Sequence, residues 1–370
     1  MLHPARAIPY KELHDGLMGA VAAGNVSTKR EGELALFTYT RSCVYDNAWD
    51  DFSLMARGLI LNEKREQVIA TPFPKFFNVG ERDEPIPDQP FETFEKLDGS
   101  LIIAFWGGFE WCTATKGSFS SEQALWANLQ LRKLRTSGLL RETTFLFEAI
   151  YPENRIVIRY LEPKLVLLAA YDDFGYEYPY NELLYNAEAM GCELAKRHEY
   201  ASVSELLEKA ETLPGDEEGF VLRFKDGHRL KVKGAEYRRL HALIHRVTPL
   251  ALWEAMRSGD DLKKFRKDLP EEFWEDFDRI EGKLSAGYTG LLTEMTKILI
   301  KLQDKSDKEV GLALKDYPPE LRRLIFPLRR HSVSDPKTQR LLYQQIRPTG
   351  NRLAGYEPSY AINRAQEEAE

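Results

Sequence analysis

The stretch from 217 to 234 reads EEGFVLRFKDGHRLKVKG and places an Asp-Gly pair, at 226–227, between two runs of strand-forming residues. Such a pair is typical of a β-hairpin with a two-residue turn. A two-residue turn predicts a register in which Leu222 faces Lys231. Because side chains alternate between the faces of a strand, one face is expected to combine a carboxylate, two lysines and two apolar side chains. These residues are Glu218, Phe220, Leu222, Lys231 and Lys233.

Two interpretations of that face stay open from the hairpin alone. A row of lysines is commonly a solvated surface. The wall of a half-buried cleft would carry the same lysines next to Phe220 and Leu222, with the carboxylate of Glu218 beside a cation. The second interpretation requires other residues that belong to the same site.

Length and composition are those of an ordinary globular protein. The chain has 370 residues, more than one compact core usually contains, so two domains are expected. Hydrophobic residues make up 43% and charged residues 29%, which excludes a disordered or fibrous chain. The net charge of −7 argues against a nucleic-acid coat protein, but local basic patches decide contact with phosphate.

The same sequence indicates a reducing compartment. Only three cysteines occur, widely spaced, which predicts neither a disulfide framework nor a Cys-rich zinc site. No apolar run approaches the roughly 18 residues of a membrane-spanning helix, and the amino terminus lacks the pattern of a secretory signal. We therefore expect a cytoplasmic protein without membrane contact.

The patterning of apolar residues changes near residue 240. Before it, short runs rich in β-branched and aromatic residues predict strands, and two amphipathic stretches predict helices. Strands and helices that do not alternate regularly predict an α+β domain built on antiparallel sheets. The region 241–370 has only helical periodicity and a polar tail ending in AQEEAE, and it predicts a separate helical domain. The predicted strands are 101–106, 145–151, 164–172 and 219–224, and the predicted helices are 120–134 and 181–197.

A lysine that could act as a nucleophile precedes the first of these strands. Residues 95–100 read EKLDGS and would place Lys96 at the mouth of a cleft. Lysine attacks only when unprotonated, so we expect burial and nearby positive charge, from Lys231 and Lys233, to lower its pKa. Taken alone, Lys-x-Asp-Gly is equally compatible with a turn that carries a solvated lysine.

Together, four segments resemble the ordered motifs of covalent nucleotidyltransferases, which include DNA ligases, RNA ligases and mRNA capping enzymes. They are EKLDGS (95–100), FEAIYPENRIVIRY (147–160), EEGFVLRF (217–224) and LKVKGAEY (230–237). Within that superfamily the chain is most similar to the RNA ligase 1 family of T-even phages, and the resemblance covers about 37–240. The discriminating stretches are FTY (37–39), ARGLIL (56–61), PKFFN (74–78) and TKGSFSSEQALWAN (115–128).

This resemblance implies a fold and an activity. The fold is α+β, with a nucleotidyltransferase (ATP-grasp-like ligase adenylation) domain at 1–240 and an all-helical C-terminal domain at 241–370. The activity is ATP-dependent joining of RNA 5′-phosphate and 3′-hydroxyl ends through lysyl-AMP and RNA-adenylate intermediates.

The resemblance also implies roles for individual residues. Lys96 would attack the α-phosphorus of ATP, Glu148 would bind the ribose, and Glu218 would help to place Mg²⁺ or Mn²⁺. Phosphoryl transfer needs several cations around a polyanion and a metal that bridges oxygens, which suits these residue types. The other implied site residues are Arg57, Lys75, Lys231 and Lys233 for phosphates, Lys116 for the adenosine, and Tyr39 and Tyr237 lining the site.

Rival functions differ in class. DNA ligation or RNA capping would use the same chemistry, but those enzymes usually carry an OB-fold, and the strand-poor C-terminal region argues against one. A non-catalytic RNA-end-binding protein could keep the fold, but the intact Lys-x-Asp-Gly element with Lys231 and Lys233 argues for catalysis.

The expected partner is RNA, bound by a monomer. The related phage enzyme mends cut transfer RNA anticodon loops, so repair of a nicked anticodon loop is a further hypothesis. Residues 321–347 hold seven basic residues against the single acid Asp335, which predicts either an RNA-binding patch or the solvated face of a helix pair. The seven are Arg322, Arg323, Arg329, Arg330, Lys337, Arg340 and Arg347.

Overall fold

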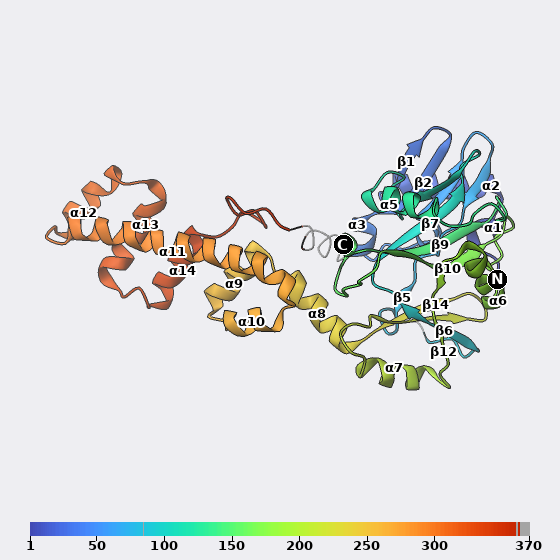
Figure 1. The fold of residues 1–370 in the computed structure, drawn as a ribbon. Coiled ribbons are helices and arrows are strands. Elements are labelled where there is room, and N and C mark those ends of the chain that lie inside the picture. The colour runs from blue at the N-terminus through green and yellow to red at the C-terminus, as the bar shows by residue number, and fades with distance from the viewer. Residues whose placement is uncertain (84, 360–361, 363–370) are drawn as a thin grey trace. The chain divides into compact units, whose positions relative to one another are not determined.

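The computed structural model describes residues 1–83, 85–359 and 362, which form two compact units (Figure 1). The first unit contains Met1–Arg239 and the second begins at Leu240. The polar tail that ends in AQEEAE lies outside the described residues. Over the described ranges, no helix is long and apolar enough to cross a membrane.

The first sheet of the first unit has four antiparallel strands in the order β1-β2-β3-β4. They are β1 (Val26–Glu31), β2 (Leu34–Tyr39), β3 (Arg57–Asn62) and β4 (Gln67–Ala70). One face packs against α2 (Tyr10–Ala22), where Leu13 and Leu17 are buried with Phe37 and Leu59. Three short helices accompany this sheet: α1 (Pro4–Ala7), α3 (Arg41–Tyr45) and α4 (Asp51–Met55).

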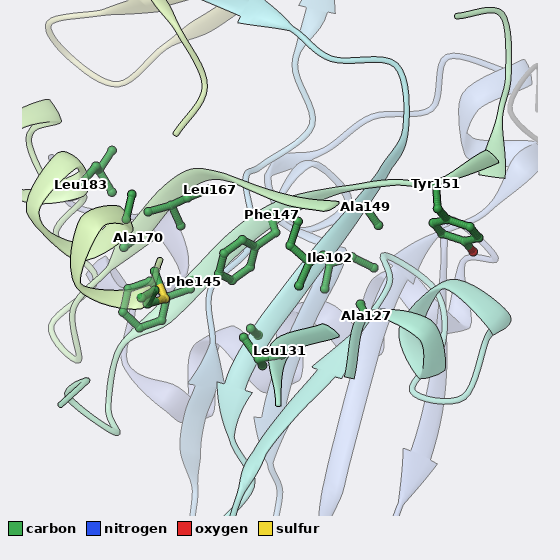
Figure 2. Packing of buried hydrophobic residues seen from close by; sticks show 14 residues of the cluster. Ile102, Ala127, Leu131, Phe145, Phe147, Ala149, Tyr151, Leu167, Ala170 and Leu183 are labelled. Carbon is green, nitrogen blue, oxygen red and sulfur yellow. The ribbon is translucent and has the colours of Figure 1, made fainter. Parts of the chain in front are cut away.

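The second sheet separates two hydrophobic cores. Its order is β11-β10-β9-β7-β8, with only the short β10–β11 pair parallel. Because side chains alternate along β7, Ile102 packs toward α5 and α6, whereas Ile103 packs toward the first sheet. Figure 2 shows the former cluster, in which β7, β9 and β10 meet the two helices. The elements are β7 (Ser100–Trp106), β8 (Trp111–Ala114), β9 (Thr144–Ile150), β10 (Lys164–Tyr171), β11 (Glu193–Leu194), α5 (Glu122–Leu131), α6 (Tyr180–Met190) and the 3-10 turn Pro152–Asn154.

The third sheet brings the predicted hairpin beside the Lys-x-Asp-Gly element. Its order is β12-β6-β13-β14-β5, and β6 pairs with β13 so that Lys96 lies opposite Gly219. Helix α7 covers one face through Leu206, which packs with Phe220 and Leu222. The elements are β5 (Phe77–Asn78), β6 (Phe91–Lys96), β12 (Arg197–His198), β13 (Gly219–Phe224), β14 (Arg229–Lys233) and α7 (Val203–Glu211).

The hairpin register predicted from the sequence is wrong by one residue. Val221, not Leu222, lies opposite Lys231. The turn has three residues rather than two, because the amide of Phe224 donates to the carbonyl of His228 at 2.9 Å and Gly227 adopts φ +93°. A slip of one residue exchanges the faces of a strand. Phe220 and Leu222 therefore belong to the core under α7, and the lysines of β14 belong to the opposite face.

Glu218 still meets the lysines, by a different geometry. Gly219 has φ +142°, a conformation that favours glycine, and a Cβ there would lie 2.0 Å from the carbonyl oxygen of Val232. Because of this conformation, the side chains at the start of β13 do not alternate regularly between the two faces of the sheet. The carboxylate of Glu218 consequently lies 3.2 Å from the ammonium of Lys233.

Most of the predicted elements of the first unit are confirmed, but both predicted helices are too long: the helix predicted over 120–134 forms over Glu122–Leu131. The strands predicted at 101–106, 145–151, 164–172 and 219–224 all form, with ends shifted by one residue or less. The helix predicted over 181–197 ends at Met190 because Gly191 adopts a left-handed conformation at its C-cap. The residues that follow form β11 and β12 instead.

The second unit is built from helices around a core of leucine, isoleucine and methionine side chains. Met295 and Ile298 of the long helix α11 pack with Leu321, Leu324 and Ile325 of α13. The helices are α8 (Ala235–His245), which begins before the unit boundary, α9 (Pro249–Ser258), α10 (Leu262–Asp268), α11 (Trp274–Leu302), α12 (Asp307–Ala313), α13 (Pro319–Arg330) and α14 (Pro336–Gln345), with 3-10 turns at Glu271–Phe273 and Leu314–Asp316.

Three of the seven basic residues at 321–347 stabilise this unit internally. Arg329 donates to the carbonyl of Lys305 at 2.8 Å and also to that of Leu302, the last residue of α11. Arg322 donates to the carbonyl of Tyr317 at 2.7 Å. Arg330 forms an ion pair of 2.8 Å with Asp307. A fourth, Arg347, lies 5.4 Å from the ring centre of Trp253, so the RNA-binding interpretation of this segment depends on Arg323, Lys337 and Arg340.

Candidate active site

Lys96 and Glu218 form the centre of the candidate site. The ammonium of Lys96 lies 2.6 Å from Oε1 of Glu218, and the ammonium of Lys233 lies 3.2 Å from the same oxygen. The Lys96 side chain is 22% exposed and the Glu218 side chain 3%, so the carboxylate is enclosed while the amine keeps an opening. A buried carboxylate shared by two lysines can position the amine that is to react.

Glycine at position 99 lets the loop at 97–99, which follows Lys96, approach the second sheet. A Cβ on Gly99 would lie 2.5 Å from the carbonyl oxygen of Ala149 and 3.1 Å from Cγ of Glu148. Real Cβ atoms do not approach a backbone oxygen so closely, so only glycine fits here. The loop after Lys96 is thereby held against β9, the strand that carries Glu148.

Asp98 anchors the same loop from within the protein. Its Oδ2 accepts hydrogen bonds from the amides of Val157 at 2.9 Å and Ile158 at 2.7 Å. Its Oδ1 accepts one from the hydroxyl of Tyr237 at 2.8 Å, and its own amide donates to the hydroxyl of Tyr160 at 3.0 Å. Buried polar groups persist only when they are bonded in this way. Asp98 therefore joins the loop at 97–99 to the 157–160 segment and to the start of α8.

The pKa of Lys96 does not follow the prediction. Burial alone would lower this pKa, but three nearby carboxylates raise it above the usual lysine range. They belong to Glu218, Glu148 and Asp98. In this structure Lys96 is therefore an ammonium group, and the expectation of a lowered pKa is wrong because it did not take these carboxylates into account.

Lys231, unlike Lys96, has a strongly lowered pKa. Burial lowers its pKa to about 7, and the surrounding positive charges act in the same direction. These charges belong to Lys75, Lys96, Lys233 and Arg57. Within the described residues, no carboxylate forms an ion pair with Lys231. A group in this setting gains strongly from a bound anion, because the anion would supply the missing negative charge.

Arg57 contributes two further donors without partners. Its Nε and Nη1 atoms are buried and meet no hydrogen-bond acceptor among the described residues. The neighbouring Gly58, with φ +93°, brings β3 against the turn that carries Lys116, where a Cβ would lie 2.9 Å from Cα of Lys116. Buried donors without partners are costly, so an anion at this position would relieve the cost.

Lys75 and Lys116 lie against aromatic rings. The ammonium of Lys75 is 5.6 Å from the ring centre of Tyr39, and that of Lys116 is 5.7 Å from the same ring. Trp49 and Phe77 complete the surroundings of Lys75, at 5.4 Å and 5.1 Å. The positive charges of Lys116 and its neighbours also lower the pKa of Tyr39, although burial by itself would raise it.

Glu218 has the properties required of a ligand for a divalent cation. Its Oε2 atom is buried and has no hydrogen-bond partner among the described residues. Burial would raise its pKa, but Lys96 and Lys233 lower it below the usual range, so the group is ionised. No cluster of three or more His, Cys, Asp or Glu residues that could bind a metal occurs in the described part of the chain. A cation here would need further oxygen ligands from phosphate and water, which suits Mg²⁺ or Mn²⁺.

The structure brings most of the predicted site residues together and gives one of them an additional role. Tyr237 is only 1% exposed; its hydroxyl group is bonded to Asp98, while its ring lies 5.1 Å from the ammonium of Lys233. Sequence reasoning missed Asp98 as an anchor and Trp49 as a neighbour of Lys75. The motif Lys-x-Asp-Gly already contained the first, whereas no local pattern marked the second. The residues brought together are Tyr39, Arg57, Lys75, Lys96, Lys116, Glu148, Glu218, Lys231 and Lys233.

Replacing Tyr237 by phenylalanine tests the role of Asp98. We expect Tyr237→Phe to lower the free energy of unfolding by about 1–3 kcal/mol, because a buried carboxyl oxygen loses its hydrogen-bond partner. Chemical denaturation at pH 7 measures this change. The matched control is Tyr185→Phe, at a side chain 73% exposed, for which the expected change is below about 0.5 kcal/mol. Equal effects of the two substitutions would contradict the anchoring role.

Two known proteins that are similar to this chain in sequence have RNA ligase in their names. Over 235 residues the chain is 30% identical to a protein of Autographa californica nuclear polyhedrosis virus, assigned as a bifunctional polynucleotide kinase/RNA ligase, covering 55% of this chain and 33% of the relative. Over 184 residues it is 31% identical to RNA ligase 1 of bacteriophage TS2126, covering 42% of this chain and 44% of the relative. The chain thus spans less than half the length of either relative.

A solved structure supports the fold. An archaeal ATP-dependent RNA ligase superposes with a TM-score of 0.50 at 14% sequence identity, covering 76% of this chain and 83% of that chain. At this identity the likeness concerns the fold alone, and it confirms the predicted nucleotidyltransferase architecture.

Residues 55–237, which include every predicted site residue except Tyr39, match the family model described as RNA ligase. Over these residues, the chain is thus similar to the RNA ligase family.

Proposed function

We propose that the protein is an ATP-dependent RNA ligase that joins a 5′-phosphate to a 3′-hydroxyl through a lysyl-AMP intermediate on Lys96. The observation that carries this proposal is the contact of 2.6 Å between Lys96 and the buried carboxylate of Glu218, at the edge of a cluster of cations. A reactive amine, an ionised carboxylate and an unneutralised cation cluster are what transfer of a nucleotide to an amine requires. The family match supports the same conclusion.

In the first step Lys96 forms a bond from Nζ to the α-phosphorus of ATP, and the bond from that phosphorus to pyrophosphate breaks. Lys96 must first give up a proton, and Oε1 of Glu218, at 2.6 Å, is the nearest carboxylate acceptor. The same carboxylate raises the pKa of Lys96. Once Glu218 shares its charge with a cation, it stabilises the ammonium less, and the free amine becomes easier to form.

The cations of the site would bind the phosphates in this step. Lys231 lacks a carboxylate partner, and two donors of Arg57 lack acceptors within the described residues, so both gain more from phosphate oxygens than paired groups would. Lys233 remains close enough to Glu218 to orient it. A divalent cation bound by Glu218 would neutralise charge that develops on the phosphate and leaving-group oxygens.

Two further transfers complete the proposed reaction. AMP passes from Lys96 to the RNA 5′-phosphate, which forms a 5′-5′ pyrophosphate linkage. The RNA 3′-hydroxyl then attacks that 5′-phosphate, a phosphodiester forms, and AMP leaves. Dividing one difficult displacement into steps with a good leaving group is the advantage of a covalent intermediate.

The raised pKa of Lys96 predicts how the first step depends on pH. At saturating ATP, adenylylation should rise about tenfold per pH unit from neutral to weakly alkaline pH, because the fraction of free amine rises in that proportion. In Glu218→Gln the profile should reach its plateau at lower pH, since the pKa of Lys96 falls when the carboxylate is removed, while the maximal rate falls by roughly 10²–10³-fold. The exposed neighbour Glu217, replaced by glutamine, is the control. A profile that does not shift in Glu218→Gln would contradict this role.

The acceptor distinguishes the proposed activity from its rivals. We expect a 5′-phosphorylated RNA to be joined in the presence of ATP and Mg²⁺ or Mn²⁺, and a DNA strand of the same sequence to react much more slowly. Joining of DNA alone would favour a DNA ligase, and transfer of GMP to a 5′-diphosphate end would favour a capping enzyme. Repair of a nicked anticodon loop, the narrower form of this proposal, requires that substrate to react faster than a linear RNA with the same ends.

A further inference from the structure

Three aromatic rings surround the ammonium of Lys75. Its Nζ lies 5.6 Å, 5.4 Å and 5.1 Å from the ring centres of Tyr39, Trp49 and Phe77. The rings also contact one another edge to face, with Trp49 at the centre: 5.0 Å from Tyr39 and 5.6 Å from Phe77. These four residues are called the aromatic cage below. Of the three rings, Trp49 is the one that contacts both of the others as well as Lys75.

The aromatic cage fixes a lysine without neutralising it. Among the described residues no carboxylate forms an ion pair with Lys75, whereas Lys96 and Lys233 share Glu218. Ring faces attract an ammonium through their quadrupole and carry no net charge. Burial lowers the pKa of Lys75, and the charges of Arg57 and Lys116 act in the same direction, against the opposite effect of Tyr39 and Glu81. The cage thus directs a cation whose charge stays available for an anion.

The position of the aromatic cage indicates which anion Lys75 would bind. In the third sheet, β14 carries Lys231 and lies between β13, which pairs with the strand of Lys96, and β5, which carries Phe77 of the cage. Lys231 therefore lies between the aromatic cage and Lys96. A single phosphate at Lys96 could be reached by Lys231 and Lys233. Cations continuing from Lys96 past Lys231 to Lys75 match a chain of phosphates rather than one.

We propose that Trp49 is a positioning residue that directs Lys75 toward the phosphates of ATP beyond the first, and that it thereby sets the preference of the site for ATP over AMP. This inference rests on the proposed function, because it takes the nucleophile and the bound nucleotide from it. Trp49 lies in the loop between α3 and α4. Tryptophan offers the strongest cation–π face of the aromatic side chains.

Nucleotide affinity in a Lys96→Ala background tests this inference, because the variant binds nucleotide without forming the covalent adduct. Titration calorimetry with ATP and with AMP compares Trp49→Leu and Trp49→Phe with the parent. We expect Trp49→Leu to weaken ATP binding roughly 3- to 30-fold, the size of one cation–π contact, and AMP binding less than about twofold. Trp49→Phe, which keeps a ring, should lose less than Trp49→Leu.

Two controls separate positioning from a general structural effect. Trp106→Leu removes a ring that contacts Arg141 at 4.4 Å on the β7–β8 hairpin, and it should change neither affinity. In a Lys75→Met background, Trp49→Leu should have no additional effect on ATP affinity, because residues that act through one another are not additive. If the leucine variant does not fold, Trp49→Phe with and without Lys75→Met makes the same comparison.

The outcomes distinguish failure of the inference from failure of the proposed function. Equal losses for ATP and AMP, no loss for either, or full additivity with Lys75→Met would overturn the role of Trp49 and leave the ligase proposal intact. A parent Lys96→Ala protein that binds neither nucleotide would overturn the nucleotide site itself, and the inference with it.

Discussion

The contact of the buried Glu218 carboxylate with Lys96 and Lys233 is the interaction on which the rest of the site depends. A carboxylate 3% exposed is stable only beside opposite charge, and two ammonium groups at 2.6 Å and 3.2 Å supply it. The backbone is shaped to allow this contact. The φ of +142° at Gly219 directs Glu218 to the lysines, and the missing Cβ at position 99 lets the loop at 97–99 reach β9.

Around this contact the site accumulates positive charge in a protein whose net charge is −7. Few carboxylates neutralise it. Lys75 lies among aromatic rings, Lys231 has a pKa of about 7 because of burial and its cationic neighbours, and donors of Arg57 meet no acceptor within the described residues. Such an arrangement is unfavourable for the protein alone and becomes favourable when a polyanion binds. Local charge, not net charge, therefore determines which ligand the site accepts.

Sequence patterns predicted the strands and the grouping of motif lysines with Glu218, because period-two alternation and ordered motifs are local signals. They did not predict the hairpin register, since Asp-Gly is compatible with both two- and three-residue turns. The raised pKa of Lys96 and the contact of Trp49 with Lys75 depend on residues far apart in the chain. Tyr237 was expected to line the site; its ring lies 5.1 Å from the ammonium of Lys233, and its hydroxyl group also anchors Asp98.

Intact-protein mass after incubation with ATP and a divalent cation tests the central claim most directly, that Lys96 is the residue that carries AMP. The wild-type protein, first shown to be free of bound AMP, is predicted to gain the mass of one AMP, and Lys96→Ala to gain none. An adduct of the same mass in Lys96→Ala, or no adduct in the wild-type protein, would contradict the account.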